Sequence, residues 1–157
     1  MTDRDLLVGV ISDTHGLLRP QALDALRGSD LIIHAGDVGQ PDVLAPLRAL
    51  APLHVVRGNV DHGAWAAQLP PTAHVDAGGA LFHVLHNIAD LDFDPAQAGL
   101  AAVVYGHSHQ PSIETRNGVL FLNPGSAGPR RFSLPITLAR VRVAGRALHP
   151  EIVTLAA

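Results

Sequence analysis

Residues 6–16 read LLVGVISDTHG and set the pattern from which the fold can be worked out. Residues 6–11 form a nearly continuous apolar run, as expected of a β-strand that is buried on both faces. The run ends abruptly in the polar sequence SDTHG, whose Ser, Asp and Gly are typical of a turn. This order predicts a buried strand that delivers Asp13 and His15 to the loop at its carboxyl end.

The next 45 residues repeat the same arrangement with helices between the strands. Residues 20–26 predict a short helix that begins with Pro, and residues 41–50 predict a second with apolar residues at amphipathic spacing. Further buried strands are expected at residues 31–35 and 53–57. A β-α-β-α-β order predicts parallel strands joined by crossover helices, and therefore an α/β fold.

The second half of the chain is rich in strands, and Asn117-Gly118 gives a strong hairpin signal. A loop with a helical turn is expected at residues 91–99. No repeat, low-complexity tract or linker interrupts the sequence, so residues 1–157 are expected to form a single domain. The strands are predicted at residues 80–85, 101–105, 113–116, 119–122, 134–143 and 146–155.

The composition excludes several classes of function. All 11 basic residues are Arg, the formal net charge is −3, and there is no basic run, which argues against a dedicated nucleic-acid surface. The absence of Lys and Cys excludes Schiff-base chemistry, thiolate metal sites and disulfides. No apolar run approaches the roughly 18 to 20 residues that span a membrane, so we expect a cytoplasmic protein without a membrane partner.

Metal-ligating side chains directly follow five of the predicted strands. The carboxyl ends of neighbouring strands in such a sheet share one edge, where ligands bind. Oxygen and nitrogen donors without sulfur suit divalent Mn, Fe, Co, Ni or Zn, and a Gly before three of these residues would permit tight turns. The candidate ligands are Asp13, His15, Asp37, Asn59, His86, His107 and His109.

Carboxylates mixed with imidazoles would suit a pair of cations. Two divalent ions about 3.5–4 Å apart need a bridging anion, which a shared carboxylate can provide. Such a pair could hold a hydroxide at neutral pH and neutralise phosphoryl oxygens, as the hydrolysis of a phosphate ester requires.

The ordered motifs D-x-H, G-D, G-N, a lone His and G-H-x-H resemble the calcineurin-like metallophosphoesterase superfamily. The segments SDTHG, HAGD, VRGN, YGHSH and NPGS resemble its small YfcE-type phosphodiesterase branch. The resemblance implies a four-layer α/β/β/α sandwich of two mixed sheets flanked by helices. It also implies that Asp37 bridges two metals and that residues 123–126 wall the mouth of the site. The first metal would be held by Asp13, His15 and His109, and the second by Asn59, His86 and His107.

One position departs from the pattern of the superfamily. Most members follow the motif Asn with a His that assists the leaving group, and here Val60 stands in its place. A missing general acid typically forgoes about 10²- to 10⁴-fold in rate. Asp61 or His62 could substitute from the same loop, and we take His62 as the candidate beside Asp37 and Asn59.

Each candidate ligand also has a plainer interpretation when taken alone. Asp13, His15 and Asp37 could be turn or helix-capping residues, and Asn59 a left-handed turn residue. His86 could be a hydrogen-bonded core histidine. His34 precedes the Asp37 loop and could orient it without binding a metal.

The preferred function is a phosphodiesterase that uses two divalent ions, Mn²⁺ foremost, to hydrolyse small phosphodiesters. No cluster of basic residues is evident that would hold a dianionic monoester. There are two alternative functions: a scaffold that binds protein partners, and a nuclease that acts on DNA. The sequence is also compatible with a homo-oligomer.

Overall fold

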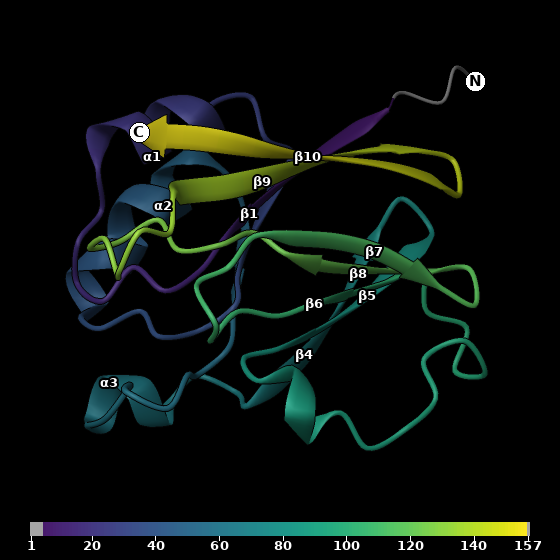
Figure 1. The fold of residues 1–157 in the computed structure, drawn as a ribbon, viewed down its shortest axis with the longest axis horizontal. Helices are drawn as coiled ribbons and strands as arrows, with labels where there is room; N and C mark the ends of the chain where they lie inside the picture. The colour runs from purple at the N-terminus through teal and green to yellow at the C-terminus, as the bar shows by residue number, and fades with distance from the viewer. Residues whose placement is uncertain (1–4, 157) are drawn as a thin grey trace.

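The computed structural model of the chain describes residues 5–156 and contains two five-stranded sheets (Figure 1). In the first sheet β1 pairs in parallel with β2, and β2 with β3, whereas β9 runs antiparallel to β1. This sheet therefore combines the predicted parallel unit with the C-terminal hairpin. Its strands in spatial order are β10 (Ala147–Ala156), β9 (Ile136–Ala144), β1 (Leu6–Ile11), β2 (Leu31–His34) and β3 (Leu53–Val55).

The second sheet has three parallel strands in its centre and an antiparallel strand at each edge. Asn117 and Gly118 both have positive φ, at 51° and 78°, as expected of the tight hairpin between β7 and β8. The strands in spatial order are β4 (Thr72–Ala77), β5 (Ala80–Leu85), β6 (Ala102–Val104), β8 (Val119–Asn123) and β7 (Ser112–Arg116).

The helices are few and short. Helix α1 (Pro20–Leu26) has the predicted bounds, and residues 41–50 form a 3-10 turn, η1 (Pro41–Val43), that leads into α2 (Leu44–Leu50). Pro46 lies in the first turn of α2, where its missing N–H costs no helical hydrogen bond. Among residues 5–156, no helix has the length and hydropathy to cross a membrane.

Two elements were not predicted, β4 and the short helix α3 (Ala64–Ala67). Strand β4 reads TAHVDA and lacks the apolar run that marks a buried strand, because only alternate residues such as Val75 and Ala77 are buried. The expected loop after β5 contains a 3-10 turn, η2 (Ile88–Asp90), and a helical turn in which the Ala98 N–H donates to the Asp94 carbonyl at 3.1 Å.

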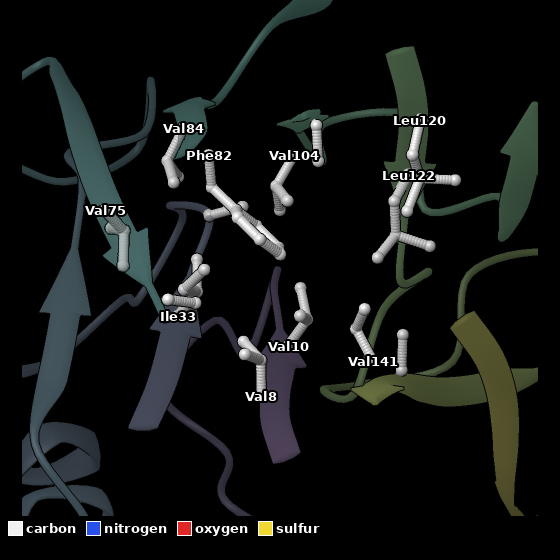
Figure 2. Packing of buried hydrophobic residues seen from close by; sticks show 14 of the residues in the cluster. Val8, Val10, Ile33, Val75, Phe82, Val84, Val104, Leu120, Leu122 and Val141 are labelled. Carbon is white, nitrogen blue, oxygen red and sulfur yellow. The ribbon is translucent and has the colours of Figure 1, made fainter. Parts of the chain in front are cut away.

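The main core lies between the two sheets. Val8 and Val10 of β1 face Phe82, Val104 and Leu122 from the second sheet (Figure 2). A second cluster packs α1 and α2 against the outer face of the first sheet, and the loop after β5 covers the outer face of the second. The predicted α/β sandwich of two mixed sheets is confirmed, with a loop and the turn η2 in the fourth layer.

The ring of Phe82, which is fully buried between the sheets, gives a direct test of this core. Phe82→Ala removes the ring and leaves a cavity, so the free energy of unfolding should fall by about 3–5 kcal/mol in urea titrations. Ile113→Ala at a site 44% exposed is the control and should cost less than about 1 kcal/mol. A loss below about 1 kcal/mol for the Phe82 variant would mean that the two sheets do not share this core.

Candidate metal centre

The candidate ligands lie at the carboxyl ends of the parallel strands of both sheets. Asp13, Asp37 and Asn59 follow β1, β2 and β3 of the first sheet, and the three later histidines follow β5 and β6 of the second. The stacking of the two sheets therefore brings segments almost a hundred residues apart into one cluster, as the hydrogen bond from the His107 N–H to Oδ2 of Asp13 (3.1 Å) illustrates.

The first group of donor atoms consists of Asp13, His15 and His109. The Nε2 atoms of the two histidines are 3.3 Å apart, and Nε2 of His109 lies 3.5 Å from Oδ1 of Asp13. Two donors that each lie about 2.1 Å from one ion are separated by about 3.0–3.4 Å at octahedral or tetrahedral angles. The third distance, from Nε2 of His15 to Oδ1 of Asp13, is 3.8 Å, so the group is slightly wider than this spacing and a small inward movement would close it around a single cation.

The second group consists of Asp37, His86 and His107. Oδ2 of Asp37 lies 3.2 Å from Nε2 of His86 and 3.7 Å from Nε2 of His15, so this oxygen stands between the two groups. Nδ1 of His107 lies 3.2 Å from Oδ1 of Asn59, which adds an amide oxygen to the second group.

Each carboxylate has one oxygen held by the protein and the other directed at the centre. Oδ2 of Asp13 accepts hydrogen bonds from the Ser12 hydroxyl (2.8 Å) and the His107 N–H (3.1 Å), and Oδ1 of Asp37 accepts from the Val60 N–H (3.0 Å). Oδ1 of Asp13 is buried and has no hydrogen-bond partner. Such an atom is costly to bury unless a cation or proton meets it.

The tautomer of His86 is fixed by the backbone. Because the Ala35 carbonyl can only accept, Nδ1–H of His86 must donate to it (2.8 Å), and this leaves Nε2 without a proton in the neutral ring. Nε2 is buried, makes no hydrogen bond and faces both carboxylates. A lone pair directed at two carboxylates is repulsive, and a metal ion would remove that repulsion.

The pKa shifts agree with this electrostatic picture. Burial lowers the pKa of His86, but its interaction with Asp37 and the charge of Asp13 outweigh burial, so the net pKa is raised. Burial raises the pKa of Asp37, yet the same contact with His86 and the Val60 N–H lower it overall. The site therefore favours positive charge at its centre, which a proton or a divalent cation can provide.

Backbone strain is concentrated at the same residues. Only seven non-glycine residues within the described range 5–156 have positive φ, and five of them are candidate ligands. Asp and His tolerate this conformation better than most residues, but each such position still costs of order 1–3 kcal/mol. The rest of the fold must hold these loops in place. The five are Asp13 (φ 56°), His15 (47°), Asp37 (56°), His107 (74°) and His109 (63°).

The glycines that precede three candidate ligands serve two different purposes. Gly36 has φ of 101°, as the expected tight turn requires, and a Cβ there would also lie 2.7 Å from Nδ1 of His86. Gly58 and Gly106 do not have positive φ; a Cβ at Gly106 would lie 2.6 Å from Oδ2 of Asp13. The expected tight turns are present at both, since the Asp61 N–H donates to the Gly58 carbonyl (3.2 Å) and the Ser108 N–H donates to the Gly106 carbonyl (2.9 Å). Glycine is needed at these two positions because the loops touch.

His34 connects the loop that carries Asp13 with the loop that carries Asp37. The hydroxyl of Thr14 donates to the Val38 carbonyl (2.9 Å), so Nε2–H of His34 must donate to Thr14 Oγ1 (3.0 Å). Nδ1 of His34 accepts from the Gly36 N–H (3.1 Å). Complete burial lowers the pKa of His34 to about 4, so the ring is neutral and orients the loops as the sequence suggested.

Asp61 is one of the two possible proton donors, but its carboxylate binds the backbone of neighbouring loops. Its carboxylate accepts three backbone N–H groups, from Val38 (3.2 Å), Gly39 (2.9 Å) and Gly58 (2.9 Å). Both carboxylate oxygens are therefore occupied by backbone donors, and neither is available to a leaving group. Sequence reasoning missed this role, because an aspartate three residues after a Gly carries no sign of the distant amides that it binds.

The other candidate acid, His62, is exposed, and within the described part of the chain no hydrogen bond connects it to the cluster.

Residues 123–126 also differ from the expected wall at the mouth of the site. They are buried, with Nδ2 of Asn123 donating to the Gly106 carbonyl (3.1 Å) and the Ser126 hydroxyl donating to the Asp13 carbonyl (2.9 Å). Asn123 ends β8, and through these two bonds the segment supports the loops that carry Gly106 and Asp13.

Residues 6–146 match the model of the calcineurin-like phosphoesterase superfamily domain. The chain belongs to this superfamily. A curated "probable metallophosphoesterase" from Methanothermobacter thermautotrophicus is 33% identical over 160 residues, which cover 94% of this chain and 92% of that protein. The match spans all of the strand-end motifs.

Solved structures share the fold of this chain. A predicted phosphoesterase from Streptococcus pneumoniae superposes with a TM-score of 0.75 at 26% identity, covering 98% of this chain and 92% of that one. An archaeal phosphodiesterase gives 0.79 at 20% identity, with coverages of 94% and 100%. Vps29 from Cryptosporidium parvum gives 0.79 at 18%, with coverages of 99% and 100%. The last two show the fold alone.

The depressed pKa of His34 predicts a loss of stability in acid. The unfolded chain takes up a proton at this His below about pH 6.5, whereas the folded chain resists uptake until about pH 4. His34 should therefore destabilise the fold by up to about 3 kcal/mol as the pH falls from 6.5 to 4. The measurement is urea unfolding of chelator-treated protein across this range.

The control for this prediction is His34→Gln, which keeps a polar side chain but does not titrate. Its stability at neutral pH should be lower, yet it should depend less on pH between 6.5 and 4. Parallel pH curves for the two proteins would show that His34 is not the titrating group.

Proposed function

We propose that this member of the superfamily is a single-domain phosphodiesterase that works with two divalent metal ions, with Mn²⁺ as the first candidate. Asp13, His15 and His109 hold one ion. Asn59, His86 and His107 hold the other, and Asp37 is shared. The observation that carries the proposal is the unpartnered Oδ1 of buried Asp13, which faces His86 and His109 at 3.9 and 3.5 Å.

The residues have distinct tasks in this proposal. When bound, the two cations supply Lewis acidity, which lowers the pKa of a water molecule and neutralises phosphoryl oxygens. Asp37 sets the separation of the two sites through its central Oδ2. Asn59 and His107 are exposed, unlike the buried Asp13 and Asp37, so they form the side at which a phosphate can approach.

Diesters are favoured over monoesters on grounds of charge. Burial lowers the pKa of His109, the charge of Asp13 opposes this, and the guanidinium of Arg131 lowers it further, which places one cation near the first group. A monoester dianion carries one more negative charge than a diester and is usually met by several Arg or Lys side chains. The chain has no Lys, and a diester monoanion suits this limited positive charge better.

A protein-binding scaffold is the alternative function. Vps29, whose fold this chain shares, is a vacuolar sorting protein by name. All seven candidate ligand positions carry side chains able to bind a metal, and five of them are held at positive φ, which is costly to maintain. These two features favour the enzyme.

Hydrolysis of bis(p-nitrophenyl) phosphate tests the proposed function. The purified protein should turn over this substrate with Mn²⁺ and stop when a chelator removes the metal. Asp37→Ala should lower kcat by at least about 10³-fold and weaken Mn²⁺ binding in calorimetry, because both ions lose a ligand. Asp42→Ala, at an exposed carboxylate in η1, should change neither quantity. Substantial turnover by the Asp37 variant would contradict the shared-ligand assignment.

His62 remains our candidate for assisting the leaving group, since Val60 cannot donate a proton. If it does so, His62→Ala should slow aryl diesters with poor phenolate leaving groups more than those with good ones. Rates measured across a series of phenols would show a steeper dependence on phenol pKa in the variant. An unchanged slope would remove His62 from the mechanism.

A further inference from the structure

A cavity of about 540 Å³ opens beside the second ligand group. Asn59, His86 and His107 line one end of it, so a phosphate held at these residues would extend an attached group into the cavity. Its other walls are the outer face of β4 and β5 and the loop that follows β5. This volume exceeds what a phosphate needs and is in the range of small-molecule pockets.

His83 lines this cavity, and one of its ring nitrogens has no hydrogen-bond partner within the described part of the protein. In β5 the side chains of Phe82 and Val84 enter the core between the sheets, so His83 lies on the opposite, outer face. It is 5% exposed, and its Nδ1 is buried without a hydrogen-bond partner. A buried polar ring beside a cavity is a residue that a ligand or ordered water would satisfy.

The walls around His83 are aromatic and apolar. Phe93 meets the His83 ring edge-to-face, with centroids 5.0 Å apart and an interplanar angle of 84°, and is itself 38% exposed. Leu85 and Leu91 also line the cavity. An exposed aromatic ring in a concave, apolar setting favours a flat partner, since stacking adds to the burial of its surface.

The charges in the cavity disfavour a second anion. The carboxylates of Asp90 and Asp92 line it, against the single guanidinium of Arg57, which already donates to the Leu69 carbonyl at 3.2 Å. Burial and the neighbouring His74 lower the pKa of His83, so its ring is neutral. The anionic phosphate therefore belongs at the ligand cluster and an uncharged or cationic group in the cavity.

We propose that this cavity binds one ester group of the diester substrate, and that this group is a planar aromatic or heterocyclic ring without an anionic substituent. Phe93 stacks on the ring, His83 offers a ring nitrogen as a hydrogen-bonding group, and Asp92 repels anionic substituents. Nucleoside-like and aryl groups meet this description. The inference rests on the proposed phosphodiesterase function and specifies the class of its substrates.

Three p-nitrophenyl diesters with the same leaving group test the inference. Their second ester groups are methyl, phenyl and 4-carboxyphenyl. With the Mn²⁺-loaded wild-type protein, kcat/KM should be about three- to tenfold higher for phenyl than for methyl. It should be about fivefold or more lower for 4-carboxyphenyl than for phenyl, because of the nearby carboxylates.

Two variants connect these preferences to the cavity. Phe93→Leu should abolish the advantage of phenyl over methyl, and Asp92→Asn should improve 4-carboxyphenyl relative to phenyl. Ile113→Ala, on the exposed strand β7, should leave all ratios unchanged. If Phe93→Leu slows all three substrates alike, the nitrophenyl ring itself occupies the cavity, which also supports the inference.

The possible failures can be told apart. Wild-type protein that hydrolyses none of the diesters would overturn the proposed function, and this inference with it. Wild-type protein that hydrolyses all three at similar kcat/KM, with no effect of Phe93→Leu, would leave the phosphodiesterase function intact and overturn the inference alone.

Discussion

The structure depends on one feature, a cluster of carboxylate oxygens and imidazole nitrogens that face one another without a Lys or Arg side chain between them. Asp13 is fully buried with its Oδ1 unpartnered, and Nε2 of His86 and His109 point towards the same oxygen. No Lys exists in the chain to enter this space. Burying such a carboxylate costs several kcal/mol unless a cation or proton meets it, so the cluster is consistent with a site built for metal ions.

Much of the surrounding structure serves to hold this arrangement. Five candidate ligands keep positive φ, and the loops that carry them touch closely enough to exclude a Cβ at Gly58 and Gly106. Neutral His34 and buried Asp61 tie these loops together by hydrogen bonds to backbone groups and to Thr14. The candidate ligands are thus held in position by buried polar contacts and by close packing of the loops, and not by long helices.

The sequence predicted those features that depend on residues close together in the chain. Apolar runs such as residues 6–11 and 80–85 reveal buried strands, and the polar residues that end them reveal the candidate ligands, because strand and loop are adjacent in the chain. The role of Asp61 and the real need for glycine at position 106 could not be predicted, since both arise from contacts between distant segments. Strand β4 was missed because half of its residues face outward.

The most direct test of the central claim is the anomalous scattering from a crystal of the protein equilibrated with Mn²⁺. Our account predicts two peaks about 3.5–4 Å apart, with Oδ2 of Asp37 bound to both. One should be completed by Asp13, His15 and His109, and the other by Asn59, His86 and His107. A single peak, or two peaks of which one does not touch Asp37, would contradict it.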